Sequence, residues 1–136
     1  MTLPMPVSFF LLLGRGVSEM TTFIANGFSP SMLSRLPAAV EFSAVNVKEF
    51  CQVIASGVQN AIGHQGTVDL VNSICGSSLK VNRISINALV GDNIYIVMLT
   101  TRLEEGKVLN KDEVMKMYNE GKVRFIRAKI YGPVFG

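Results

Sequence analysis

The chain contains few of the residues on which metal sites and disulfide-stabilised folds depend. Its 136 residues include one histidine, two cysteines and no tryptophan. Because Cys51 and Cys75 do not form a CxxC motif and only one histidine accompanies them, neither a zinc site nor a disulfide framework is expected. We therefore expect two free, buried thiols in a reducing compartment, with no metal and no other cofactor.

A strong excess of one charge and long hydrophobic runs are also absent. The 13 lysine and arginine residues stand against 10 acidic residues, which gives a net charge of +3. This charge is too small for the basic stripe of a protein that binds duplex nucleic acid, but it suits a small anionic ligand. The apolar run at residues 7–13 is too short to span a bilayer, and Arg15 follows it rather than preceding it as in a signal peptide. We expect no membrane partner and a location in the cytoplasm, that of the host cell if a virus encodes the chain.

What is present predicts one folded domain. The composition is 49% hydrophobic and 17% charged, as in an ordinary globular protein, and the length suits a single core. We treat residues 1–19 as a leader of doubtful status, either an over-called gene start or a poorly ordered extension. Residues 20–136 are the expected domain.

Strand patterns alternate with helix patterns from residue 21 onward. The pattern at Asn93–Thr100 is apolar on both faces, as in a central strand, and the Gly91-Asp92 turn predicts antiparallel pairing with the strand before it. The order predicts an α/β (α+β) fold, a single domain with a mixed sheet of about five strands flanked by helices. Strands are predicted at Thr22–Ala25, Ala39–Phe42, Val81–Asn87, Asn93–Thr100 and Val123–Ile130.

Residues typical of helix ends occur between these predicted strands. A first helix is predicted from Ser29 to Pro37, with Met32, Leu33 and Leu36 buried. Three more helices are predicted after the caps Asn46, His64 and Asn110, and they end at Gly57, Gly76 and Gly121.

The single histidine, His64, stands between Gly63 and a predicted helix start. Backbone N–H groups at a helix start favour an anion, so a phosphate could lie there with the imidazole beside it. Gly63 and Gly66 would let a ligand approach the backbone closely. A lone histidine is more often structural than catalytic, so its position alone leaves both interpretations open.

Two further places carry polar residues that chemistry could use. Arg102 and Glu105 follow the predicted central strand, where an arginine could grip a phosphate, although a solvated loop is the simpler explanation. Asn26 and Ser29 follow the first strand and could bind a base or ribose, although Ser29 is already explained as a helix cap.

Five separated segments combine these places into one pattern: Ile24–Ser29, Ala61–Gln65, Val71–Gly76, Val81–Arg83 and Arg102–Lys107. Together they resemble the viral type III anti-CRISPR ring nucleases, small proteins of archaeal viruses that also occur in phages, plasmids and some cellular genomes. The resemblance runs from about Met20 to Ile130.

The resemblance implies a homodimer that binds one cyclic tetra-adenylate across its two-fold axis and cuts it without metal. In the family, the ribose 2′-OH attacks the adjacent phosphorus and the histidine, here His64, protonates the departing 5′ oxygen, which leaves a 2′,3′-cyclic phosphate. Arg102 would stabilise the phosphate in the transition state and Glu105 would assist. Such an activity switches off type III CRISPR signalling. Substrate-binding residues are then expected at Asn26, Ser29, Ser31, Gly63, Gln65, Gly66 and Arg83.

The chain departs from the family in two places. Gln65-Gly66 stands where Asp-Ser is frequent, and Met98 stands where a polar residue is frequent. Two other functions stay open: a protein of the same fold that binds a cyclic nucleotide or an RNA end without cutting it, and a small structural or interaction protein of a virus. His64, Arg102 and Glu105 favour the enzyme over the first, and the lack of a long amphipathic segment disfavours membrane contact.

Overall fold

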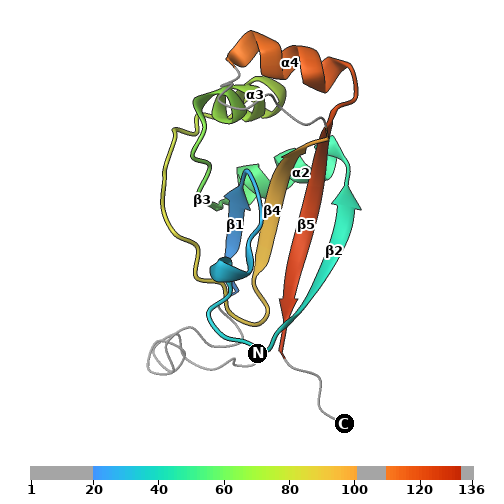
Figure 1. Cartoon of the computed structure of the whole chain (residues 1–136). Helices are drawn as coiled ribbons and strands as arrows, with labels where there is room; N and C mark the ends of the chain where they lie inside the picture. The colour runs from blue at the N-terminus through green and yellow to red at the C-terminus, as the bar shows by residue number, and fades with distance from the viewer. Residues whose placement is uncertain (1–19, 101–109, 133–136) are drawn as a thin grey trace, which may run out of the picture.

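A computed structural model of the chain describes residues 20–100 and 110–132 (Figure 1). Its centre is a five-stranded mixed sheet with the strand order β2-β5-β4-β1-β3, and the predicted α/β single domain is confirmed. The expected leader, residues 1–19, lies outside the described residues. The strands are β1 (Thr22–Ala25), β2 (Ala39–Val45), β3 (Gln59–Asn60), β4 (Asn93–Leu99) and β5 (Val123–Tyr131).

The strand β4 is central, as its two apolar faces predict. It pairs parallel with β1 and antiparallel with β5, while β1 also pairs parallel with β3, and β5 pairs antiparallel with β2. Ile94, Tyr95, Ile96 and Val97 are all buried, so β4 contributes to the core on both faces of the sheet.

The predicted strand at Val81–Asn87 is wrong, and so is its antiparallel pairing with β4. This segment is extended but belongs to no ladder; an isolated bridge joins Ala88 to Leu33. Both edges of β4 are already occupied, by β5 and by β1, and β1 pairs on its other edge with the unpredicted two-residue strand β3. The segment instead buries Ile86 and Ala88 against one face of the sheet, which produces a strand-like apolar pattern without strand pairing.

Three of the four predicted helices are confirmed with their caps. They are α2 (Val47–Ser56), α3 (Gln65–Cys75) and α4 (Lys111–Asn119). Asn46 accepts the Glu49 N–H at 2.7 Å, and Asn110 forms a complete capping box with Glu113. The helix α3 ends at Gly76, whose φ of +66° lies in the left-handed region that glycine adopts without strain.

The first predicted helix is wrong in extent. It is a single 3-10 turn, η1 (Pro30–Met32), although Ser29 does cap it. The chain turns extended at Leu33, and Ser34 donates its N–H to the Ala88 carbonyl at 2.9 Å. Leu36, expected in the core, is 67% exposed. The backbone after η1 forms a hydrogen bond with Ala88, so the helix does not continue into a second turn.

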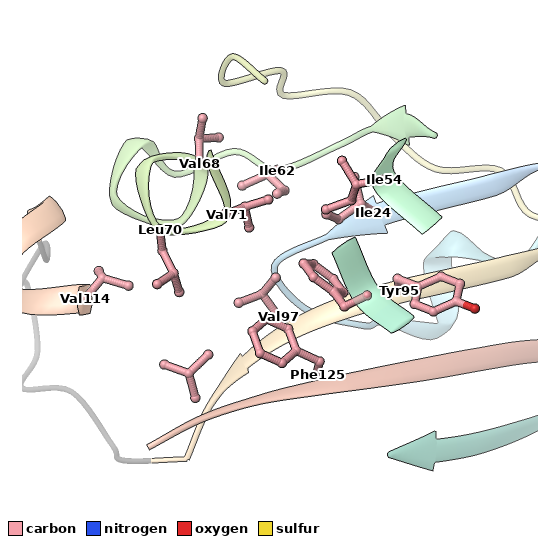
Figure 2. Close-up of a cluster of buried hydrophobic side chains, with 12 residues drawn as sticks. Ile24, Ile54, Ile62, Val68, Leu70, Val71, Tyr95, Val97, Val114 and Phe125 are labelled. Carbon is pink, nitrogen blue, oxygen red and sulfur yellow. The ribbon is translucent and has the colours of Figure 1, made fainter. Parts of the chain in front are cut away.

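The main core lies between the sheet and its three helices. Figure 2 shows side chains of α3 directed at those of β1, β4 and β5. The Phe50 ring of α2 packs on the Phe125 ring of β5, with 4.4 Å between centroids. Burial of each such side chain stabilises the fold by roughly 1.5–3 kcal/mol, so this face provides the rigid support for the start of α3.

The opposite face has a smaller core and a buried carboxylate. Phe23, Ile94 and Ile130 pack there beneath η1 and the segment around Ile86. Asp92, which is 1% exposed, accepts the backbone N–H groups of Thr21 and Leu89, at 2.9 and 2.8 Å. These bonds join the turn before β4 to the start of β1, so Asp92 has a structural role.

A disulfide joins Cys51 of α2 to Cys75 at the end of α3. The expectation of two free thiols is therefore wrong. The two positions are 24 residues apart, and side-by-side packing of two helices brings their Cα atoms to 5.1 Å, within the range that a disulfide bridges. No spacing motif announces such a pair, because the distance between the cysteines is set by tertiary packing.

Candidate functional site

The carboxyl ends of three parallel strands meet at one edge of the sheet. The strands β1, β3 and β4 run in the same direction, and their carboxyl ends point toward α3 and α4 (Figure 1). In open α/β sheets, ligands bind beyond the carboxyl ends of the strands, where the loops present their side chains. Asn26 follows β1 directly, and Gly63 and His64 follow β3.

His64 is the N-cap of α3 and is exposed. Its carbonyl accepts the Val68 N–H at 3.1 Å, which confirms the predicted helix start. Its imidazole makes no capping hydrogen bond with the helix. The first N–H groups of an eleven-residue helix have no partner within that helix and carry its positive dipole end. An imidazole in this position can act on an anion held by those N–H groups.

Gly63, beside His64, is held from two sides. The Asn26 side chain accepts the Gly63 N–H at 3.0 Å, and Arg83 donates its Nε–H to the Gly63 carbonyl at 3.0 Å. A Cβ atom at position 63 would lie 3.1 Å from Cγ of Arg83, so glycine allows the arginine to lie close against the backbone. Within residues 20–100 and 110–132, no hydrogen bond or ion pair engages the Nη groups of Arg83. A guanidinium with free Nη groups is suited to an anion such as phosphate.

A shallow pocket of about 280 Å³ opens beside Asn26. Its lining is mainly apolar, with Asn26 and Ser29 as the polar side chains. Ser29 and Ser31 are hydrogen-bonded to each other, with 3.0 Å between their Oγ atoms. The lining consists of Ala25, Asn26, Gly27, Phe28, Ser29, Met32, Ala61, Ile84 and Ile86.

The structure brings some of the expected site residues together. Asn26 and Arg83 contact Gly63 next to His64, and Ser29 lies in the pocket that Asn26 also lines.

Other expected residues differ in their environment. Gln65 is exposed, but its side chain donates to Asp69 within α3 at 2.9 Å, and Gly66 is buried in the first turn. Arg102 and Glu105 lie outside the described residues.

Asn60 and Asn72 are part of the surroundings of this site, although the sequence analysis assigned neither. Asn60 accepts the Ile62 N–H at 3.0 Å, and Asn72 contacts the backbone of Leu79. An asparagine side chain often accepts the backbone N–H two residues further on and stabilises a turn, as Asn60 does at the end of β3. The partners of Asn72 could not be foreseen, because they depend on how the chain returns after α3.

Among the described residues, a pKa that departs from its ordinary value belongs to Tyr131, on the strand pair β2 and β5. Tyr131 of β5 donates to Glu41 of β2 at 3.1 Å, and this hydrogen bond raises the pKa of Tyr131. Tyr131 therefore belongs to the β2–β5 edge rather than to the candidate site.

Fold and site together define a single-domain α/β protein with a candidate anion site at the carboxyl edge of its parallel strands. The chain belongs to the STIV B116-like family, whose profile matches residues 22–124. It is similar in structure to B116 of Sulfolobus turreted icosahedral virus, with a TM-score of 0.64 and 36% identity, over 80% of this chain and 98% of that one.

Relatives in sequence also come from archaeal viruses. The chain is 40% identical over 116 residues to Uncharacterized protein ORF116 of Acidianus filamentous virus 1, which covers 85% of this chain and 100% of the relative. It is 34% identical over 67 residues to Uncharacterized protein ORF117 of Acidianus two-tailed virus, covering 49% of this chain and 57% of the relative. Family membership therefore places the chain among viral proteins and assigns no activity.

Proposed function

We propose that the chain is a metal-independent ring nuclease that cuts cyclic tetra-adenylate into linear di-adenylate ending in a 2′,3′-cyclic phosphate. The observation that carries this proposal is the exposed imidazole of His64, at the start of α3, beside a glycine backbone held by Asn26 and Arg83. The resemblance of the five sequence segments to ring nucleases supplies the substrate.

In this reaction the protein has to orient the phosphodiester and supply one proton to the leaving oxygen. The ribose 2′-OH of the substrate attacks the adjacent phosphorus and releases its proton to water. The P–O5′ bond breaks, and His64 protonates the departing 5′ oxygen. The Nη groups of Arg83, which no described residue engages, and the first N–H groups of α3 can hold the phosphate, so that the attacking and leaving oxygens lie in line. The resemblance to ring nucleases assigns the stabilisation of the transition state to Arg102, assisted by Glu105, and both residues follow β4 in sequence.

The biological role that fits this activity is the ending of type III CRISPR signalling in the cytoplasm of an infected cell. Membership of a family of archaeal virus proteins supports that role, because a virus gains from destroying the messenger of host immunity. Within the described ranges, no helix is long and apolar enough to cross a membrane.

Purified protein incubated with labelled cyclic tetra-adenylate in EDTA tests the activity. The expected product is linear di-adenylate with a cyclic phosphate end, separated by chromatography and identified by mass. An intact ring that stays bound to the protein would support the rival function, binding without cutting. A requirement for added metal would contradict the mechanism.

We also propose that the protein is a homodimer. Its interface would be the exposed area around Phe42, on the sheet face that carries the smaller core. Phe42 of β2 is 55% exposed, and it pairs in register with Ala128, beside Ala44 and Ile126 on the same face. The Phe42 ring packs edge-on against Phe28, at 5.2 Å between centroids, and Phe28 lines the pocket. A second copy that covers Phe42 would therefore bring two pockets close together, as a ligand with two-fold symmetry requires.

Phe42→Lys is expected to convert this dimer to a monomer, because it places a charge in the centre of an apolar contact. Sedimentation measures the mass at micromolar concentration. Val90→Lys is the matched control, since Val90 is similarly exposed, at 51%, but lies beside Gly132 after the end of β5 and not beside Ala128, which pairs with Phe42. The proposal fails if the unmodified protein sediments as a monomer with ligand present, or if the Phe42 variant stays dimeric.

A further inference from the structure

Arg83 lies on a segment that has no regular structure to hold it in place. Residues 77–92, which we call the strap, connect α3 to β4 without a helix or a strand. A side chain on a sheet is positioned by its ladder, but the strap has only an isolated bridge, at Ala88. The backbone groups of the strap near Arg83 must find other partners.

Asn72 of α3 holds the beginning of the strap. Its Oδ1 accepts the Leu79 N–H at 2.8 Å and the Ser77 hydroxyl at 2.7 Å, and its Nδ2 donates to the Leu79 carbonyl at 2.8 Å. The path of the strap away from α3 is therefore set by one asparagine.

Asn60 and Asn82 then fasten the strap to the segment that leads to His64. Asn82 donates its backbone N–H to the Ile62 carbonyl at 2.9 Å and its Nδ2 to the Asn60 carbonyl at 2.8 Å. Asn60 donates its own Nδ2 to the Lys80 carbonyl. Together with the hydrogen bond from Arg83 to Gly63, these contacts join residues 60–63 to residues 80–83.

We propose that Asn82 and Asn60 are positioning residues, which hold the Arg83 guanidinium against Gly63 so that its Nη groups face a phosphodiester bound beside His64. Asn82 is exposed and contributes no side chain to the core, so its hydrogen bonds act mainly on the placement of the strap. The ligand in this proposal rests on the proposed function, whereas the placement of Arg83 does not.

The placement of Arg83 can be read directly without any ligand. Its Nε–H donates to a backbone carbonyl, so its NMR signal is expected to exchange slowly with solvent in the unmodified protein. Asn82→Ala is expected to speed that exchange by about tenfold, because loss of one hydrogen bond loosens the strap. Asn87→Ala is the matched control: Asn87 is also an exposed asparagine on the strap, and no side-chain hydrogen bond joins it to the described residues.

A structural role would lower stability without acting specifically on Arg83. Melting temperatures of both variants are therefore measured, and Asn60→Asp serves as a second variant in case Asn82→Ala does not fold. Asn60→Asp keeps the acceptor for Ile62 and removes the donor to Lys80. Unchanged exchange at Arg83 Nε in folded Asn82→Ala or Asn60→Asp protein would overturn the positioning role.

Measurements of ligand binding then test whether Asn82 acts through Arg83. In a His64→Ala background, which prevents cleavage, Asn82→Ala and Arg83→Ala are each expected to weaken binding of cyclic tetra-adenylate by about tenfold. The double variant is expected to bind the ring less than about twofold more weakly than the Arg83→Ala variant, because Asn82 affects binding through Arg83. Full additivity would overturn the proposal. If the parent does not bind this ring at all, the proposed function fails, while the exchange measurement still decides the positioning role.

Discussion

His64→Ala is expected to slow the cutting of cyclic tetra-adenylate by roughly a hundredfold to ten-thousandfold, the range that general acid catalysis supplies. Binding is expected to stay within about threefold, because protonation of the leaving oxygen stabilises the transition state and not the bound ring. The imidazole is exposed and makes no capping hydrogen bond, so its removal has little reason to disturb α3. Single-turnover cleavage with excess protein and a separate binding titration measure the two effects.

His64→Ser is the control for the helix start. Serine is a preferred N-cap residue, so it should preserve or improve the stability of α3, yet it is a poor acid. Both variants should therefore be equally slow, whatever their melting temperatures. Cleavage by either variant at the rate of the unmodified protein would remove His64 from the mechanism and leave the ring-cutting group to be sought elsewhere.

Loss of the Cys51–Cys75 disulfide is expected to lower the free energy of unfolding by about 3 kcal/mol, since the bond closes a loop across 24 positions in the unfolded chain. For a chain of this length, that loss corresponds to a fall in melting temperature on the order of 10 °C. The loop contains β3, His64 and nearly all of α3, so the disulfide stabilises the element on which the candidate acid stands.

Cys51→Ala, Cys75→Ala and the double variant are expected to show the same loss, because each removes the one bond. Reduction of the unmodified protein should lower its melting temperature to nearly the same value and should leave the double variant unchanged. Alkylation before and after reduction, followed by mass measurement, counts the free thiols. Two thiols that react without reduction would contradict the disulfide.

Local sequence signals predicted the elements whose determinants are neighbours in the chain. Asn46 and Asn110 cap helices because their side chains reach an N–H three residues away, and the left-handed end of α3 needs only Gly76. The central position of β4 follows from its continuous apolar residues. The start of α3 at His64 was predicted in the same way, together with the first strand.

The errors occurred where the partner of a segment is distant in the sequence. Val81–Asn87 has a strand pattern but no free edge of β4 to join, and the helix predicted at Pro30 stops because Ala88 binds the backbone after it. Cys51 and Cys75 meet only because α2 and α3 pack together. In each case the outcome depends on a contact between segments that are distant in the sequence.

The candidate site also combines features set by adjacent residues with features set by tertiary packing. Sequence alone determined that His64 stands at a helix start with glycine beside it, since both features depend on adjacent residues. Only the tertiary structure decided that Asn26 and Arg83 hold Gly63 from two sides, and that Asn60 and Asn82 hold the strap that carries Arg83. The physical reason is that these hydrogen bonds join segments whose separation is set by the packing of the sheet and α3, which no local pattern records.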